Sequence, residues 1–216
     1  MKKKKIKLLV ASMAVAAMLV GGTLAWFTFH QEMDNHFSTG SSVKTNIHEK
    51  FDPKKAENMQ PGVKVTKQVT VENTGNSAAL LRVKITPVWD ADKSRGLSET
   101  DATDAVDLNL ANNSDWIKGN DGYYYYTQVL NKNATSSELL DSVDIKGSFN
   151  MTEDYQNRGL TVKVESDAIQ TTNGAWQDAW KTAAADPNVK AALEKIQTAN
   201  TATTTNEITA DKEVAK

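Results

Sequence analysis

Cysteine is absent from this 216-residue chain, so no disulfide bond can stabilise the fold. The sequence also contains no Gly-x-Ser-x-Gly element, and it therefore offers neither a cysteine nucleophile nor a serine nucleophile of that type. Alternating strand and helix patterns are missing as well, which argues against a parallel sheet. Packing, sheet hydrogen bonds or assembly must therefore hold the protein together.

The first 25 residues have the pattern of a cleaved export signal. Five lysines precede an apolar segment from Leu8 to Val20, and small residues lead up to Ala25. We expect cleavage between Ala25 and Trp26, followed by secretion to the extracellular matrix or the cell surface. Secretion without disulfides is common in Gram-positive bacteria, which are therefore the expected source.

A permanent membrane anchor is the alternative interpretation of this segment. Residues 8–29 carry no charge and are about long enough to cross a bilayer. However, Gly21 and Gly22 interrupt the helical pattern, and no basic cluster follows it. We therefore favour cleavage.

Removal of residues 1–25 leaves 20 basic and 27 acidic residues, a net charge of −7 before histidine is counted. This excess of negative charge argues against nucleic acid or an anionic membrane as a partner. The remaining chain is long enough for one domain and a tail.

Directly after the expected cut, large apolar residues recur with a period of two, which predicts a strand with one apolar face. Only Gln31 and Asn35 interrupt this face, and polar or charged residues occupy the opposite face. Such a strand at a newly freed N-terminus can complete a sheet of its own domain or of a neighbour. We call residues 26–37 the donor segment; its apolar face consists of Phe27, Phe29, Met33 and Phe37.

Period-two patterns separated by turns continue to residue 170 and predict seven or eight strands. The clearest run, residues 63–72, is interrupted only by Lys67 and is expected to form a hairpin with residues 79–86. Asp121 and Gly122 before four tyrosines predict a second hairpin. The fold class is therefore all-β, with an antiparallel, jelly-roll-like β-sandwich over residues 26–170.

The pattern changes to helical spacing after residue 170. Trp176 and Trp180 fall on one helix face, and the pattern restarts at Asp186 and Pro187. We expect a small helical appendage over residues 171–200. The Thr-rich, charged residues 201–216 lack apolar mass and are expected to form a disordered tail.

Several of these motifs together resemble the TasA/camelysin family, and in particular its BsaA-like biofilm matrix branch. The resemblance covers residues 1 to about 170 and does not extend to the helical appendage. The motif at the signal junction is the most specific one. The residues that carry the resemblance are Gly21–Phe27, Gln60–Gly62, Val71–Asn76, Arg82 and Val83, Trp116, Asp121–Tyr126, Val129 and Leu130, and Leu139–Val143.

The resemblance implies a secreted structural subunit that is cleaved by a dedicated signal peptidase and polymerises into the fibres of a biofilm matrix. In such fibres the mature N-terminal strand of one subunit completes the sheet of the next, which is donor-strand complementation. The period-two pattern of the donor segment agrees with this role. The expected partners are further copies of the chain and the signal peptidase. The sequence leaves open whether a minor assembly subunit takes part, and it predicts no cofactor.

A camelysin-type metallopeptidase is an alternative to the structural role. The only histidines are His30, His36 and His48. A helical zinc site needs two histidines four residues apart with a glutamate between them. Residues 48–52 begin with His48 and Glu49, but they place Asp52 at the second position and adjoin a strand pattern. We therefore expect neither a metal site nor catalytic residues, and the chain is not expected to be an enzyme.

A non-polymerising surface adhesin or binding module is the other alternative. The four tyrosines Tyr123–Tyr126 could stack on a sugar, but neighbouring strand residues point to opposite faces, so two are expected in the core and two exposed. A sortase signal of the Leu-Pro-x-Thr-Gly type is not found in residues 201–216. An acidic loop could suggest a weak calcium site, but it lacks EF-hand spacing and we favour a solvated loop; its carboxylates are Asp90, Asp92, Glu99, Asp101, Asp104 and Asp107.

Overall fold

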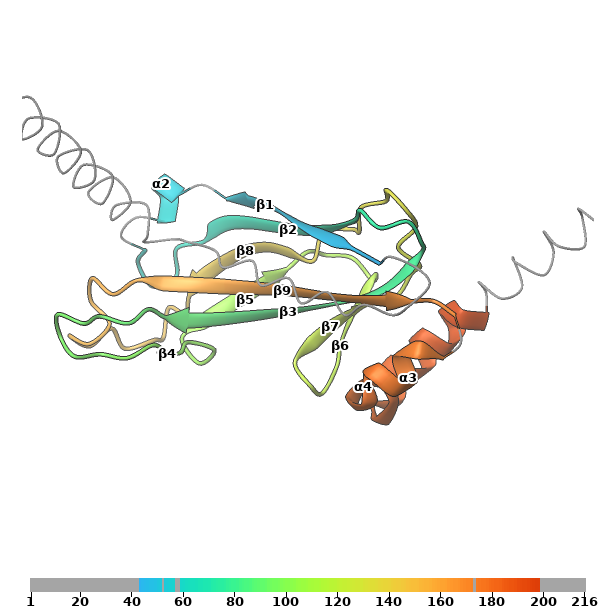
Figure 1. The fold of residues 1–216 in the computed structure, drawn as a ribbon. Coiled ribbons are helices and arrows are strands. Elements are labelled where there is room, and N and C mark those ends of the chain that lie inside the picture. The colour runs from blue at the N-terminus through green and yellow to red at the C-terminus, as the bar shows by residue number, and fades with distance from the viewer. Residues whose placement is uncertain (1–42, 52, 57–58, 173, 199–216) are drawn as a thin grey trace, which may run out of the picture.

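Two antiparallel sheets pack face to face in the computed structural model, which describes residues 43–51, 53–56, 59–172 and 174–198 (Figure 1). The first sheet has the order β1-β2-β8-β5, with bounds Thr45–Phe51, Val65–Asn73, Leu140–Ile145 and Val106–Leu110. The second has the order β4-β3-β7-β6, with bounds Thr100–Asp101, Ala79–Trp89, Tyr123–Tyr126 and Trp116–Lys118. β9 (Leu160–Gln170) pairs with β3 in this sheet, and the short helix α2 (Pro53–Ala56) follows β1.

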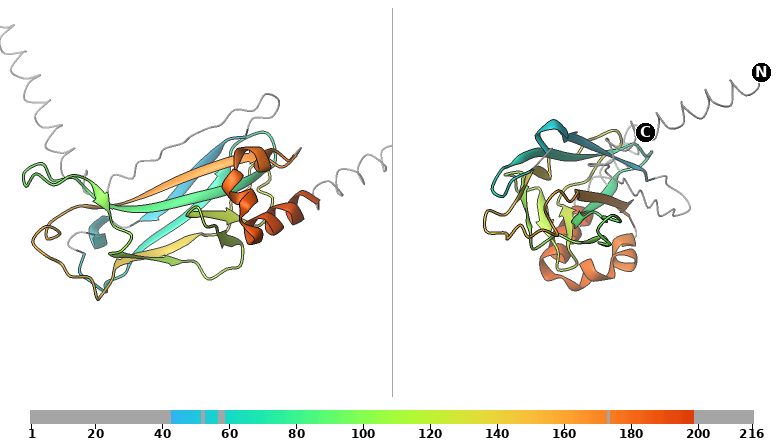
Figure 2. Two further views of the ribbon diagram at one scale, coloured as in Figure 1. Left: turned by 90° about the horizontal axis from the view of Figure 1, so that it is seen from below. Right: turned by 90° about the vertical axis from the view of Figure 1, so that its left-hand side faces the viewer.

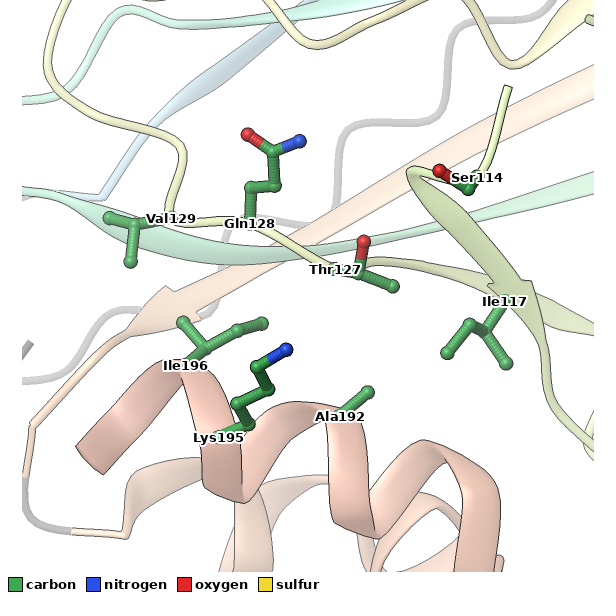
Figure 3. Close-up of a pocket in the computed structure, with 8 residues that line it drawn as sticks. All are labelled: Ser114, Ile117, Thr127, Gln128, Val129, Ala192, Lys195 and Ile196. Atoms are coloured by element: carbon green, nitrogen blue, oxygen red, sulfur yellow. The ribbon is translucent and has the colours of Figure 1, made fainter. Parts of the chain in front are cut away.

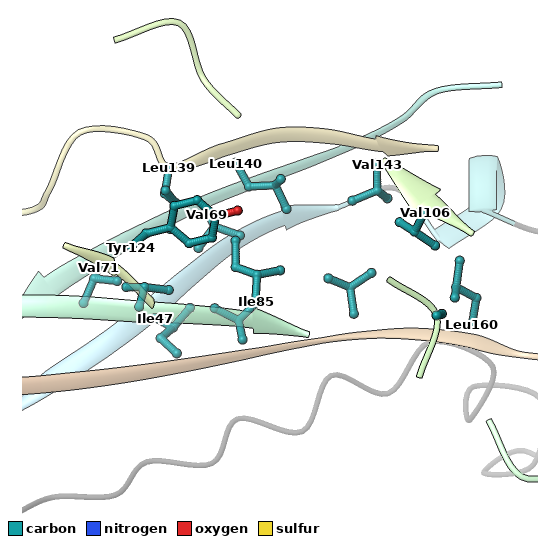
Figure 4. Packing of buried hydrophobic residues seen from close by; sticks show 14 of the residues in the cluster. Ile47, Val69, Val71, Ile85, Val106, Tyr124, Leu139, Leu140, Val143 and Leu160 are labelled. Atoms are coloured by element: carbon teal, nitrogen blue, oxygen red, sulfur yellow. The ribbon is translucent and has the colours of Figure 1, made fainter. Parts of the chain in front are cut away.

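The core lies between the two sheets, because apolar residues alternate with polar ones along the long strands. On β2, Val65, Val69 and Val71 are buried, whereas the residues between them reach the surface or are partly exposed, apart from Lys67. Figure 4 shows Leu140 and Val143 of β8 on one side of the core and Ile85 of β3 on the other. The predicted all-β antiparallel sandwich is confirmed.

The predicted hairpin between residues 63–72 and 79–86 is wrong. β2 pairs with β1 and β8, whereas β3 belongs to the second sheet, so the intervening turn carries the chain from one sheet to the other. Asn73 holds this crossing: its Nδ2 donates to the carbonyls of Ser77 and Leu130, both at 2.8 Å, and its Oδ1 accepts from the Gly75 N–H at 2.9 Å. The second predicted hairpin is confirmed, since β6 and β7 pair on either side of Gly122, whose φ of 82° suits glycine.

A helical appendage packs on the outer face of the second sheet. It consists of α3 (Ala175–Ala179), α4 (Lys181–Ala185) and a helix over residues 187–198 (Figures 1 and 2). Asp186 caps the last helix, because its Oδ1 accepts the backbone N–H groups of Asn188 and Val189, and Pro187 occupies the first helical position. The helices predicted from the sequence are thus present.

Several predictions fall on residues outside the described part of the chain. These are the cleavage site at Ala25 and Trp26, the donor segment with Phe27, Phe29, Met33 and Phe37, and the tail over residues 201–216. Within the described residues, none of the helices combines the length and the hydrophobicity that a membrane crossing requires.

Candidate functional site

The strongest candidate site is the side of the sandwich where both sheets end in long strands. β1 ends the first sheet and β9 ends the second. Near one end the two strands touch through a buried hydrogen bond of 2.9 Å between the hydroxyl oxygens of Thr45 and Ser166. Figure 1 shows that β1 separates from β9 between Thr45 and Phe51. We call this the β1/β9 side.

The backbone of β9 offers hydrogen-bonding groups on the β1/β9 side. On β3, Ala79 bonds to Leu130 through its N–H and its C=O, on the side away from β9. Hydrogen-bonded and non-hydrogen-bonded residue pairs alternate along an antiparallel ladder. Every second residue of β3, counted from Ala79, therefore directs its main-chain N–H and C=O away from β9, and its partner on β9 directs these groups away from β3. The main-chain groups of Val162, Val164 and Ser166 therefore point away from β3, while their side chains are buried. Within the described residues, β9 pairs with no other strand.

The remaining sheet ends are poorer templates for strand addition. β4 has two residues and β6 has three, too short for extended pairing. On β5, Asp107 lies directly opposite Asp144 of β8, and this pair of like charges is relieved by Asn109 Nδ2, which donates to Asp144 at 2.7 Å. An incoming strand at β5 would meet an exposed carboxylate at Asp107. The geometry thus favours the β1/β9 side as the place where a further strand can be added.

An ion pair lies on the inward face of the first sheet at the β1/β9 side. Lys67 of β2 is 0% exposed, and its ammonium lies 3.0 Å from the Glu49 carboxylate of β1, whose side chain is 19% exposed. Burial lowers the pKa of Lys67 to about 8, although Glu49 opposes this shift, and burial also raises the pKa of Glu49. The lysine that interrupts the valine pattern was the only sequence signal of this pair.

His48 does not belong to a zinc site in the described part of the chain. It lies on the outer face of β1 rather than on a helix, and its Nε2 is 2.8 Å from the Glu72 carboxylate on the neighbouring strand. No group of three or more His, Asp or Glu side chains within the described residues could hold a metal ion. His30, His36 and Asp52 lie outside these residues.

Basic residues and backbone groups pair with several carboxylates of the acidic loop. Asp92 accepts hydrogen bonds from Ser94 and contacts Arg95 at 2.7 Å, and these interactions together lower the pKa of Asp92 to about 2. Lys163 lies 2.7 Å from Glu99. Asp90, Asp101, Asp104 and Asp107 complete the loop, and no three of the six carboxylates form a group able to hold a metal ion.

Two of the four tyrosines were expected in the core and two were expected to be exposed. Tyr124 and Tyr126 face the core between the sheets. Neither of the other two is exposed: Tyr125 is 0% exposed and Tyr123 is partly buried, because the appendage covers the outer face of this sheet. A sugar-stacking surface on these two rings is therefore blocked.

A polar network fastens the appendage to the sheet. The guanidinium of Arg82 on β3 bonds Asp167 of β9 at 2.8 Å and lies 4.8 Å from the ring of Trp180. The Trp180 indole N–H donates to the same Asp167 oxygen at 2.8 Å. Asp121 accepts hydrogen bonds from the hydroxyls of Tyr125 and Thr182, both at 2.7 Å. No pattern in the sequence indicated that Arg82 joins the appendage to the sandwich.

A pocket of about 410 Å³ lies between the last helix and the segment after β7 (Figure 3). Its lining is mainly apolar, and none of its residues belongs to β1 or β9. The lining residues are Ser114, Ile117, Thr127, Gln128, Val129, Ala192, Lys195 and Ile196.

Comparison with known proteins identifies the family over most of the chain. Neither the curated proteins nor the solved structures include a significant match. A family model described as camelysin metallo-endopeptidase matches residues 1–167, which takes in the sandwich almost to the end of β9 and leaves out the helices of the appendage. Because the match spans more than half of the sequence, the chain belongs to the camelysin/TasA family.

Proposed function

We propose that this protein is a secreted structural subunit of extracellular biofilm matrix fibres, and that it polymerises by strand donation. Membership of the camelysin/TasA family supports an extracellular structural or matrix-related protein at the level of the family. Polymerisation by strand donation is supported by the backbone of β9, which points away from β3 on the side where the first sheet ends in β1.

The donor segment of a second copy suits this side. Strand addition needs main-chain pairing together with alternate side chains that enter the core. A strand that pairs with β9 presents Phe27, Phe29, Met33 and Phe37 to the space between the sheets, because they share one parity. Burial of four such side chains stabilises the contact by about 1.5–3 kcal/mol each, which offsets much of the cost of association.

Such a contact is head-to-tail. Each subunit donates a strand at its N-terminus and accepts one at the β1/β9 side, so the assembly does not close on itself and extends as a filament. Export with cleavage between Ala25 and Trp26 by a dedicated signal peptidase would release the donor segment. In this proposal the chain acts as a structural protein and not as an enzyme.

Electron microscopy of the mature chain beginning at Trp26 tests the proposal. Filaments are expected from this chain and none from a chain that lacks residues 26–37. Monomers from both would refute self-assembly and favour an adhesin or an assembly that depends on a minor subunit.

A substitution at the acceptor edge sharpens the test. Ala168 of β9 shares the outward backbone orientation, so Ala168→Pro removes an N–H that points away from β3 and spares the pairing with β3. Ala168→Pro is expected to abolish filaments, whereas the matched Ala168→Val keeps the N–H and the filaments. Filaments from Ala168→Pro would exclude pairing at this edge.

A further inference from the structure

The pocket between the last helix and the segment after β7 has one wall in the sandwich and one in the appendage (Figure 3). Ile117 of β6 and Val129 line the first wall, and both are partly buried against the apolar cluster that joins the appendage to the sheet. Ile196 of the last helix lines the second wall and belongs to that cluster. The pocket thus continues an apolar interior to the surface, and its volume of about 410 Å³ lies within the roughly 300–1,000 Å³ of small-molecule sites.

The last helix contributes a cation to this mainly apolar lining. Ala192, Lys195 and Ile196 are spaced three and four residues apart, so their side chains lie on one face of the helix. Figure 3 shows the Lys195 ammonium directed away from the helix, towards the segment after β7. The methylene stem of a lysine covers apolar surface while its charge remains in water. A positive charge therefore lies at the mouth of an apolar pocket.

Lys195 forms no ion pair with a carboxylate in the part of the chain that the structure describes. The exposed Glu194 beside it lies 3.8 Å from Lys190, one turn earlier on the same helix. At the sandwich wall, the Asp115 carboxylate accepts a hydrogen bond of 2.8 Å from the Gln128 amide. An anion that enters the pocket therefore meets a cation without a carboxylate partner among the described residues.

The sandwich wall is held in place by its own hydrogen bonds. The backbone N–H and the hydroxyl of Thr127 both donate to the carbonyl of Asp115, at 2.8 and 3.0 Å. With the Gln128 bond to the Asp115 carboxylate, three hydrogen bonds join the residue before β6 to the residues after β7. A wall that is already ordered lowers the entropic cost of binding a ligand.

We propose that this pocket binds a small aliphatic carboxylate of the fatty-acid class. The hydrocarbon chain packs against Ile117, Val129 and Ile196, and the carboxylate pairs with the Lys195 ammonium. The apolar contacts supply most of the affinity. The ion pair is exposed to water, so it contributes less, but it selects an acid over a neutral molecule of the same shape.

A ligand in this pocket also fastens the appendage. The pocket exists only while the last helix is docked, because one of its walls is that helix, so a bound ligand stabilises the docked state by mass action. The match to the family model ends at residue 167, before this helix, so family membership does not predict the site. None of the lining residues belongs to β1 or β9, and the inference is therefore independent of strand donation.

Equilibrium dialysis of the chain beginning at Trp26 tests the proposal, because it measures binding to monomers and to fibres alike. The probes are octanoate, the neutral octanol and the cationic octyltrimethylammonium, all below the concentrations at which they form micelles. Octanoate is expected to bind about fivefold more tightly than octanol, which is the upper effect of an exposed ion pair, and the cation is expected to bind most weakly. Equal affinities would overturn recognition of the carboxylate, and no binding of octanoate would overturn the site.

Three variants locate the binding. Lys195→Met keeps the apolar stem and removes the charge, so octanoate is expected to bind about fivefold more weakly, while octanol is unaffected. Lys190→Met is the matched control on the same helix and is expected to change neither affinity. Ala192→Phe fills the pocket and is expected to abolish binding of both probes. Octanoate binding that persists in Ala192→Phe, or that is unchanged in Lys195→Met, would contradict the proposal.

Hydrogen exchange provides a readout that needs no substitution. Octanoate is expected to slow the exchange of amides in residues 187–198, because it stabilises the docked helix, and to leave the exchange of β2 unchanged. Binding without slower exchange in residues 187–198 would place the ligand elsewhere on the molecule and overturn the proposal.

Discussion

Truncation of Trp180 is expected to release the helical appendage while the sandwich stays folded. The appendage contains two helices of five residues each and one over residues 187–198, and helices this short are marginal in isolation. Their stability must therefore come from packing on the second sheet. Trp180 is 2% exposed, belongs to the same apolar cluster as Leu80, and packs edge-on against the Tyr125 ring.

The expected loss of stabilising free energy follows from the interactions that Trp180→Ala removes. Loss of a buried tryptophan costs about 3–5 kcal/mol. The substitution also removes the indole hydrogen bond to Asp167 and the contact with the Arg82 guanidinium. A loss of this size is comparable to the free energy that holds a local unit closed against opening. The buried residues of the main core between the sheets do not include Trp180, so the sandwich retains its own packing.

Hydrogen exchange measures this outcome directly. In Trp180→Ala, amides of residues 175–198 are expected to lose protection, while those of β2 and β8 keep theirs. Trp180→Phe retains most of the volume and is expected to show a smaller effect, and the exposed Lys181→Ala serves as the neutral control. Loss of protection throughout β2 and β8 at the same rate would refute an appendage that opens by itself.

Two further predictions concern buried polar groups. Asn73→Ala removes three hydrogen bonds that hold the crossing between the sheets and is expected to lower the free energy of unfolding by about 3 kcal/mol in a denaturant titration; an effect no larger than that of the neighbouring exposed Thr74→Ala would contradict this role. Because the pKa of Lys67 falls from 10.5 to about 8, the unfolded chain holds this proton more tightly, so stability is expected to rise between pH 8 and about 10, by at most about 3 kcal/mol. Lys67→Met should lack this rise, and an equal rise in that variant would exclude Lys67 as its origin.

The local patterns of the sequence were reliable where one strand or one turn determines the outcome. The valine alternation predicted β2, the Asp-Gly turn predicted the β6–β7 hairpin, and Asp186 with Pro187 marked the start of the last helix. These features depend on backbone preferences and on which face of a single element is apolar, and both are encoded within a few residues.

The partners of each strand were decided by the tertiary structure. The sequence predicted that residues 63–72 pair with residues 79–86, but the turn at Asn73 instead crosses between the sheets, because its side chain bonds to Leu130, far along the chain. Two of the four tyrosines were likewise expected to be exposed, and the docking of the appendage buries Tyr125 on the outer face of the sheet.

The sequence by itself determined the all-β class, the helical appendage and the apolar parity of the donor segment, since each follows from periodicity within one element. Only the tertiary structure placed β1 and β9 on one side of the sandwich and brought Lys67 to Glu49. The physical reason is that strand pairing joins residues distant in sequence, and no local pattern specifies which strand will lie at the edge of a sheet.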